Sequence, residues 1–484
     1  MVHEHPPLPL VDHPPYTLYQ NWKVTMTEAR LKSLTLPEYG VPSVRPTLSA
    51  AIYEARLARF LERVWAEGLD AVAVYADREH SANLSYLTGF DPRFEEAVLV
   101  VAKGKTPVIL TGPENQGGAA AAQVAADVKL YQPFGLLGQN RIGTLPLDQL
   151  FADSGLQKGS KIGAVGWKYF GQHEATTPAA WLDLPSYIAD TLRSFGTVSN
   201  ATALLMDPTS GMRATIELEE LAQFEFAATH ASEGIKRVIW GVRPGMSEFE
   251  VASLMQNIGL PLAAHTMLSS GQRAYIGLNS PSDRRIEKGD PFTTALSYQG
   301  SLTCRAGFVA ESADDLPEGA KDYVERLVAP YFEAAAEWYE TVGIGVAGGV
   351  LDSQVRKRLD NPFFNLILNP GHLIHLDEWM STPIYPGSTE ALHSNSAIQL
   401  DIIPATGSKY FTTNIEDGIA LLDDRSRAEF AERFPDAWKR IQHRRAFMAD
   451  ELGIRLKPEV LPFSNLAGYL PPLLLAPNMA MSRA

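Results

Sequence analysis

Two segments in the last fifth of the sequence, residues 397–403 and 414–422, constrain the fold more than any other feature. Apolar residues recur with a period of two in both segments, which predicts two β-strands that each have an apolar and a polar face. Residues 404–408 contain Pro and Gly and favour a turn, so we expect a β-hairpin. The midpoint between positions 401 and 416 falls in the turn that separates the two segments. In a symmetric hairpin Asp401 and Glu416 are therefore predicted to lie opposite each other on the polar face.

The facing carboxylates of Asp401 and Glu416 are the first candidate functional feature. Like charges directly opposite each other on a sheet repel, so the pair requires a metal ion, a shared proton or a cationic substrate. Two solvated acids on an exposed hairpin face are the alternative interpretation, because charged side chains usually lie at the surface.

Composition limits the class of protein. The 484 residues are 45% hydrophobic and 20% charged, as in ordinary globular proteins with two or three domains. The formal net charge of −14 and the lack of a basic run argue against nucleic acid as a partner. Cys304 is the only cysteine, which fits a reducing compartment. No apolar run approaches the roughly 20 residues of a membrane helix, and the first ten residues do not resemble a signal peptide. We therefore expect a cytoplasmic protein with no membrane partner.

The pattern of the chain predicts four regions. Residues 1–45 are rich in proline and predict an extended arm that wraps a neighbouring subunit or stays disordered. Helical and strand patterns alternate over residues 46–205, which predicts an α/β domain. Residues 206–450 predict a second domain of mixed helices and strands, and residues 451–484 a C-terminal tail.

Three features of the second domain locate its helices. A helix is predicted from Glu217 to Trp240, with acidic residues in its first turn. Ser247 followed by Glu250 predicts the capped start of the next helix. The glycine-rich residues 343–348 match a dinucleotide-binding pattern, but they follow a helix where that pattern requires a strand, so we interpret them as a helix stop and restart.

Five segments in this order resemble the creatinase/prolidase/methionine-aminopeptidase (M24) superfamily. Residues 83–89 are also similar to part of the N-terminal domain of creatinase and prolidase. The resemblance implies an N-terminal α/β domain followed by an α+β catalytic-like domain with the pita-bread fold. The five segments are residues 217–228, 243–248, 280–290, 369–372, and 401–404 with 415–417.

The metallopeptidases of this superfamily bind two metal ions through two Asp, one His and two Glu residues. The resemblance places the His at His372 and the two Glu positions at Asp401 and Glu416. The two Asp positions should fall within residues 292–305, a segment that contains no acidic residue. A dinuclear metal site is therefore not expected. No cofactor is predicted, and a single divalent metal ion is the alternative.

The two missing Asp positions can be assigned only in part. The first corresponds to Thr293 or, because the loop is shorter here, to Ala295, and the second corresponds to Cys304. A further histidine that faces the substrate in the family falls on Leu278. His265, on a strand that borders the substrate in the family, is the candidate replacement.

Several polar residues complete the candidate site. Arg305 can neutralise the paired acids or bind a substrate carboxylate through two hydrogen bonds. Three polar residues follow His372 within six positions, and Glu378 is the one expected to reach the pocket. The predicted catalytic residues are His372, Asp401, Glu416, His265 and Glu378, and the predicted substrate-binding residues are Arg305 and His375.

Three functions are compatible with these residues. The first is a creatinase-like hydrolase of an amide-like or amidine-like C–N bond in a small polar substrate, without two metal ions. The second is a mononuclear metal-dependent hydrolase similar to Xaa-Pro peptidases. The third is a catalytically inactive domain that binds a peptide or protein partner. We favour an enzyme that acts on a small molecule or short peptide, and the resemblance implies a homodimer.

Overall fold

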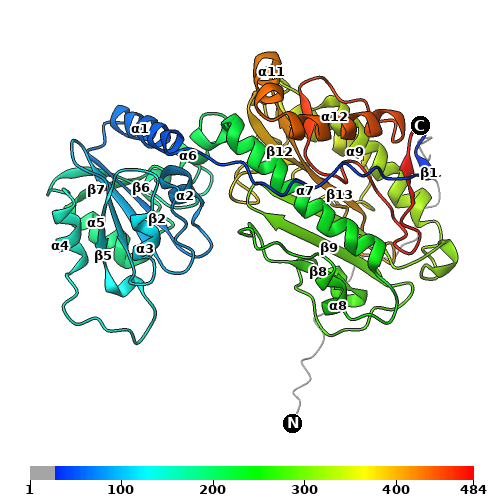
Figure 1. Cartoon of the computed structure of the whole chain (residues 1–484), viewed down its shortest axis with the longest axis horizontal. Helices are drawn as coiled ribbons and strands as arrows, with labels where there is room; N and C mark the ends of the chain where they lie inside the picture. Colours follow the sequence, from blue (N-terminus) through cyan, green and yellow to red (C-terminus); the bar gives the residue numbers. More distant parts are fainter. Residues whose placement is uncertain (1–27) are drawn as a thin grey trace, which may run out of the picture.

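The computed structural model describes residues 28–484 and contains two large β-sheets, each with its own helices, and one small sheet of two strands (Figure 1). The strands of the first sheet lie within residues 71–200, and those of the second lie within residues 267–462. The two large sheets occupy opposite ends of the long axis of the molecule (Figure 1). Residues 1–27 of the expected arm lie outside the described part of the chain.

The first sheet has six strands in the order β5-β4-β3-β2-β6-β7. Strands β2 and β3 are buried along their whole length, because alternate residues pack into two different apolar cores on the two faces of the sheet. This mixed sheet confirms the expected α/β architecture. Its strands are β2 (Ala71–Ala76), β3 (Ala97–Ala102), β4 (Val108–Thr111), β5 (Asp127–Leu130), β6 (Ser160–Val165) and β7 (Gly196–Asn200). Its helices are α1 (Ala50–Ala66), α2 (Ala82–Thr88), α3 (Gln116–Ala120), α4 (Leu147–Asp153), α5 (Ser186–Phe195) and α6 (Ala203–Met206).

The second sheet has seven strands, six of them in the order β11-β12-β13-β10-β9-β8, with β14 also paired to β13. No helix within residues 28–484 has both the length and the apolar character needed to cross a membrane. The strands are β8 (Met267–Ser270), β9 (Pro291–Tyr298), β10 (Ser301–Phe308), β11 (His372–Leu373), β12 (Ser396–Asp401), β13 (Asn414–Leu421) and β14 (Val460–Pro462). The helices are α7 (Leu218–Gly241), α8 (Glu248–Ser253), α9 (Ala329–Thr341), α10 (Gly348–Arg358), α11 (Asp424–Arg433) and α12 (Pro435–Asp450).

The helix starts predicted in this half of the chain are confirmed. Helix α7 follows Glu217 directly and carries two acids in its first turn. The hydroxyl of Ser247 accepts a hydrogen bond from the backbone N–H of Glu250, whose carboxylate accepts one from the N–H of Ser247. Residues 343–347 connect α9 to α10, so the glycine-rich string is a helix stop and restart, as interpreted.

Both ends of the described chain pack on the second sheet's half of the molecule. Strand β1 (Arg30–Ser33) pairs with β15 (Met479–Ser482), and the arm then runs along α7, where Lys236 pairs with Glu38 at 2.8 Å. Residues 28–45 therefore pack against their own chain, and their contact with a neighbouring subunit stays a prediction. The segment expected as a tail, residues 451–484, supplies buried side chains and two strands, so it is part of the core.

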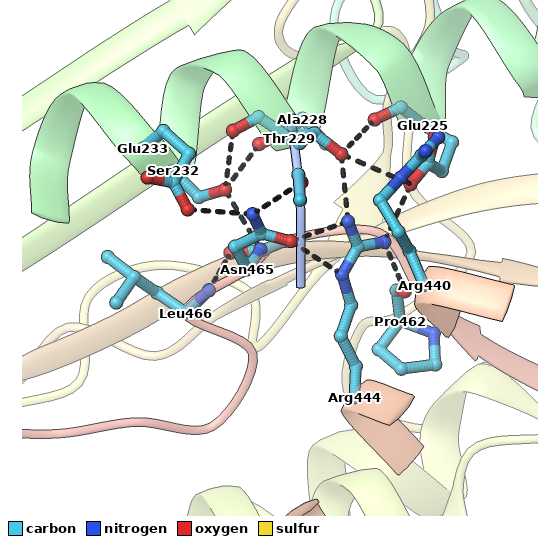
Figure 2. A network of polar contacts seen from close by, with 12 residues as sticks. Glu225, Ala228, Thr229, Ser232, Glu233, Arg440, Arg444, Pro462, Asn465 and Leu466 are labelled. Atoms are coloured by element: carbon cyan, nitrogen blue, oxygen red, sulfur yellow. Dashed lines mark hydrogen bonds and ion pairs between the residues drawn. The ribbon is translucent and has the colours of Figure 1, made fainter. Parts of the chain in front are cut away.

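A buried network of charges joins α7 to α12 (Figure 2). Arg444 donates hydrogen bonds to Glu225 at 2.8 Å and to Thr229 at 2.8 Å, and its side chain is 1% exposed. Arg440 donates to the same carboxylate at 2.9 and 2.5 Å. Asn465, which follows β14, accepts two further hydrogen bonds from Arg444. Each of these charges is paired, which is the condition under which burial of charge is tolerated.

A second buried network joins the two halves of the molecule. Arg56 of α1 donates hydrogen bonds of 2.5 Å to both Glu217 and Glu220 at the start of α7. The carboxylate of Glu220 is also 3.3 Å from Nε2 of His375. Burial by itself would raise the pKa of Glu220, but the charges of His375 and Arg56 outweigh it and lower that pKa to about 2. The network therefore holds the segment after β11 against the N-terminal half.

Candidate metal centre

The hairpin formed by β12 and β13 has the register expected from the sequence. Asp401 and Glu416 are direct partners across the two strands, so the prediction that their carboxylates face each other is confirmed. The turn is longer than expected, because residues 402–413 form a loop instead of a tight turn. Asp401 is 4% exposed and Glu416 7%, which excludes the alternative of two solvated acids.

His372 reaches the same group of residues from β11, which pairs with β12. The Nδ1–H of His372 donates to the carbonyl oxygen of Leu373 at 3.2 Å, which leaves the lone pair of Nε2 free for a ligand. The indole of Trp379 stacks on the imidazole at 4.1 Å and holds its plane. Gly371 has a φ of +142°, and a Cβ there would lie 2.8 Å from the carbonyl oxygen of Gln399. Only glycine fits directly before this histidine.

The ligand atoms of His372, Asp401 and Glu416 all lie within 4.8 Å of one another. Among the described residues this is the one group of three or more potential ligands with that geometry. Nε2 of His372 and Oδ1 of Asp401 are buried and have no hydrogen-bond partner. Buried polar atoms without a partner are costly, and one cation between these atoms would satisfy both. The residues present therefore fit a single divalent metal ion.

Electrostatics give a second reason to expect a cation in this group. Burial raises the pKa of Asp401 to about 6, although the charge of His372 lowers it. Burial and the nearby charge of Asp401 raise the pKa of Glu416 well above its usual range. Burial would lower the pKa of His372, but Glu378 and Asp401 outweigh it and raise that pKa. The raised pKa values mean that the folded protein favours added positive charge at this group, either as bound protons or as a metal ion.

Glu378 is the fourth predicted catalytic residue in this group. Its Oε1 lies 3.4 Å from Nε2 of His372, and its side chain is 23% exposed. It is the most exposed of the four side chains, so it connects the buried group to solvent.

The row of residues across the sheet shows what stands in place of the family's two Asp residues. Cys304 of β10 is the direct partner of Glu416 on one side and of Ala295 on the other. Ala295 therefore lies directly beside Cys304, and Thr293 lies two residues away along the same strand face, so both candidates for the first missing position are on this face of the sheet. Neither Ala295 nor Cys304 carries a carboxylate, so residues 292–305 offer no acidic ligand to a second ion.

The structure places three other candidate residues outside this group. His265 is exposed, and its Nε2 bonds to the carbonyl oxygen of Leu278 at 2.7 Å. His375 is buried in the network between the two halves of the molecule, where it contacts Glu220. Arg305 is buried on the opposite face of β10 from Cys304, where it pairs with Asp417 at 2.6 Å. None of the three is positioned to bind a substrate next to His372.

Two residues of the group were not among the candidates. Trp379 covers His372, and Asn414 donates a hydrogen bond to Sγ of Cys304 at 3.0 Å. Asn414 lies two residues before Glu416 on the same strand face, so the period of two could have identified it. The stacking of Trp379 depends on a loop conformation that no local pattern indicates.

Comparison with known proteins supports the fold. Residues 56–165 match the creatinase/prolidase N-terminal domain family. The prolidase of Pyrococcus horikoshii OT3 has a structure that matches with a TM-score of 0.58 and 18% identity over 76% of this chain and 95% of its own. The chain has the prolidase fold. The resemblance seen in the sequence, and with it an N-terminal α/β domain followed by a pita-bread domain, is confirmed.

Other solved structures agree with this assignment. An Xaa-Pro dipeptidase from Bacillus anthracis matches with a TM-score of 0.57 and 18% identity, over 77% of this chain and 96% of its own. A putative aminopeptidase P from the same organism matches with a TM-score of 0.54 and 14% identity, over 77% and 93%. Comparison with curated protein sequences finds no match.

Proposed function

We propose that this protein is a hydrolase that cleaves an amide-type C–N bond in a short peptide or other small polar substrate, with one divalent metal ion held by His372, Asp401 and Glu416. The observation that carries the proposal is the convergence of three ligand atoms within 4.8 Å, two of them buried without a partner. The names of the structural neighbours, prolidase and Xaa-Pro dipeptidase, support a peptide-like substrate.

The chemistry of such a site divides between the ion and the protein. A bound divalent ion would polarise the scissile carbonyl and lower the pKa of water. Glu378 is partly exposed and next to His372, so its carboxylate is placed to accept a proton from water and pass it to the leaving nitrogen. Trp379 covers the imidazole and keeps water from that side. The tautomer of His372 is set by its hydrogen bond to Leu373.

A metal-free, creatinase-like hydrolase is the second candidate, and one observation favours it. The raised pKa values of Asp401 and Glu416 allow the two carboxyl groups to share a proton, and a protonated His372 then supplies positive charge. The cluster geometry nevertheless favours the metal-dependent candidate, because the three ligand atoms lie within 4.8 Å of one another, where one ion can contact all of them.

A partner-binding domain without catalysis is less well supported. A protein partner needs a broad surface, whereas these polar atoms are buried. The hollow that borders Asp401 has about 0 Å³ of volume open to water, against the roughly 300 Å³ of a typical small-molecule site. A loop movement is therefore needed to admit a substrate.

Hydrolysis assays with defined substrates test the proposal. The protein is stripped with a chelator, reloaded with Mn²⁺, Co²⁺ or Zn²⁺, and assayed against Xaa-Pro dipeptides, other dipeptides, and small amides and amidines. We expect release of product that needs the added ion and that is lost in His372→Ala. The matched control is His443→Ala, an exposed histidine on α12 that should keep full activity. Equal activity in stripped and reloaded protein would support the metal-free candidate, and no product from any substrate would contradict both.

A further inference from the structure

We propose that Arg213 is a positioning residue for Glu378, so that the N-terminal half of the molecule completes the candidate site. The two residues are linked through residues 374–380, which follow β11 and are named the site loop. This inference rests on the proposed function, because it takes Glu378 as the group that moves the proton. It assigns a role in the reaction to a residue outside the metal centre.

One side of the site loop faces the metal ligands. Oε1 of Glu378 lies 3.4 Å from Nε2 of His372, and the indole of Trp379 stacks on the same imidazole with the ring centroids 4.1 Å apart. Glu378 and Trp379 belong to one short loop, so a shift of its backbone moves both of them relative to the histidine. A group that transfers protons has to stay within about 0.5 Å of its working position, which requires an anchor on the loop.

The other side of the site loop is held by the N-terminal half of the molecule. Arg213, in the short 3-10 turn between α6 and α7, donates a hydrogen bond of 2.5 Å to the carboxylate of Asp377, the residue directly before Glu378. Its guanidinium also donates to Oδ1 of Asn83 on α2 at 2.8 Å. The amide of Asn83 in turn donates to the carbonyl oxygen of Gly166, which follows β6, at 2.8 Å. Arg213 therefore connects the loop to two elements of the first sheet's half.

Arg213 and Asp377 form their pair away from solvent. The side chain of Arg213 is 0% exposed and that of Asp377 is 10% exposed. A hydrogen bond between a guanidinium and a carboxylate is short and directional, and water does not compete for it when the pair is buried. Asp377 is therefore fixed relative to the N-terminal half, and Glu378 is the next residue along the chain.

The backbone of the site loop transmits this anchor to Glu378. The N–H of His375 donates to the carbonyl oxygen of Asp377 at 3.0 Å, and the N–H of Met380 donates to that of Leu373 at 3.0 Å. The loop is thus closed by hydrogen bonds on both sides of Glu378. A displacement of Asp377 is passed on to Glu378 instead of being absorbed by a flexible segment.

Hydrogen exchange followed by mass spectrometry tests the anchor without an assay of activity. In the metal-free wild type the amides of His375 and Met380 should exchange slowly, because both are hydrogen-bonded. In Arg213→Gln, peptides that cover the site loop should exchange roughly tenfold faster or more, while peptides from β12 and β13 keep their rates. The matched control is Arg440→Gln, which also loses a pair with a carboxylate, but on α12, and should leave the exchange of the site loop unchanged.

A double-mutant cycle tests whether Arg213 acts through Glu378. Arg213→Gln should lower kcat about 100-fold with little change in KM, because misplacement of a reacting group by about 1 Å has an effect of this size. One ion should still bind, since its three ligands lie on β11, β12 and β13. In a Glu378→Gln background the proton carrier is already lost, so Arg213→Gln should lower kcat little further. Arg213→Lys keeps the charge and should restore part of kcat.

The outcomes separate this inference from the proposed function. Unchanged exchange of the site loop in Arg213→Gln, or losses of kcat that multiply in the double variant, overturns the inference and leaves the hydrolase standing. No hydrolysis by the wild type overturns the proposed function and the role of Glu378, while exchange still decides whether Arg213 anchors the loop. If Arg213→Gln does not fold, Asp377→Asn replaces it in both experiments. Rapid exchange of the site loop in the wild type overturns the inference without any variant.

Discussion

The replacement Asp401→Asn is expected to stabilise the metal-free protein at neutral pH. Asp401 is 4% exposed and faces Glu416, so an ionised carboxylate there is both desolvated and repelled. An amide removes the charge, keeps the size of the side chain, and can donate a hydrogen bond to the facing carboxylate. The variant should therefore gain stability and lose the function of the site, as is common where strained groups serve a function.

The magnitude follows from the pKa of Asp401, which burial raises from its ordinary 3.8 to about 6. A displacement of roughly two pH units corresponds to about 3 kcal/mol. The folded state holds the proton of Asp401 more tightly than the unfolded state does, so binding of this proton contributes to the free energy of unfolding. The contribution is full below pH 3.8 and is lost as the pH rises through 6. At pH 7.5 the variant should exceed the metal-free wild type by up to about 3 kcal/mol, and near pH 4 the two should be similar.

Urea-induced unfolding in the presence of a chelator, followed by circular dichroism at pH 4 and pH 7.5, measures this difference. The matched control is Asp417→Asn, which removes the same charge from the neighbouring strand. Asp417 is fully buried and paired with Arg305 at 2.6 Å, so its loss leaves a buried guanidinium without a carboxylate. That control should lose about 3 kcal/mol or more. If Asp401→Asn is destabilised as the control is, the two facing acids do not repel each other and the argument for a cation between them is refuted.

Three further outcomes are expected. Glu225→Gln should lower the free energy of unfolding by about 3 kcal/mol or more, because it leaves the arginines of Figure 2 unpaired. Arg440→Gln should lower it clearly less, because the side chain of Arg440 is 12% exposed. Equal losses of the two variants in urea titrations would contradict this. Gly371→Ala should weaken metal binding at least tenfold in calorimetric titrations, because the added Cβ would lie too close to the carbonyl oxygen of Gln399 and would displace His372. Unchanged affinity would show that this contact does not fix the position of His372. Light scattering should give about twice the 53.0 kDa of one chain, and a monomer at micromolar concentration would contradict the homodimer implied by the resemblance.

The part of the site that follows from local pattern was predictable from the sequence. The facing of Asp401 and Glu416 depends only on strand alternation and on the distance of each residue from the turn, so the period of two was sufficient. The capping box of Ser247 and Glu250 is local in the same way. The resemblance to a family supplied His372, which local pattern could not, because β11 has only two residues.

The misplaced candidates depended on long-range pairing. Cys304 and Arg305 are consecutive residues of β10, so they lie on opposite faces, but the sequence does not show which face meets Glu416. The pairing of β10 with β13 joins residues more than one hundred positions apart, and it turns Arg305 toward Asp417. His375 was misplaced for a related reason, because the residues that enclose it come from α2 and α7. The packing of residues 28–45 and 451–484 also depends on contacts between distant segments.

The stoichiometry of metal binding tests the central claim most directly. The stripped protein is dialysed against a small excess of Zn²⁺ or Co²⁺, and the bound ion is measured by elemental analysis, with His372→Ala as the comparison. The account predicts one ion per chain in the wild type and much less in the variant, because three buried ligands converge and residues 292–305 supply no carboxylate for a second ion. Two ions per chain, or no ion above the level of the variant, would contradict it.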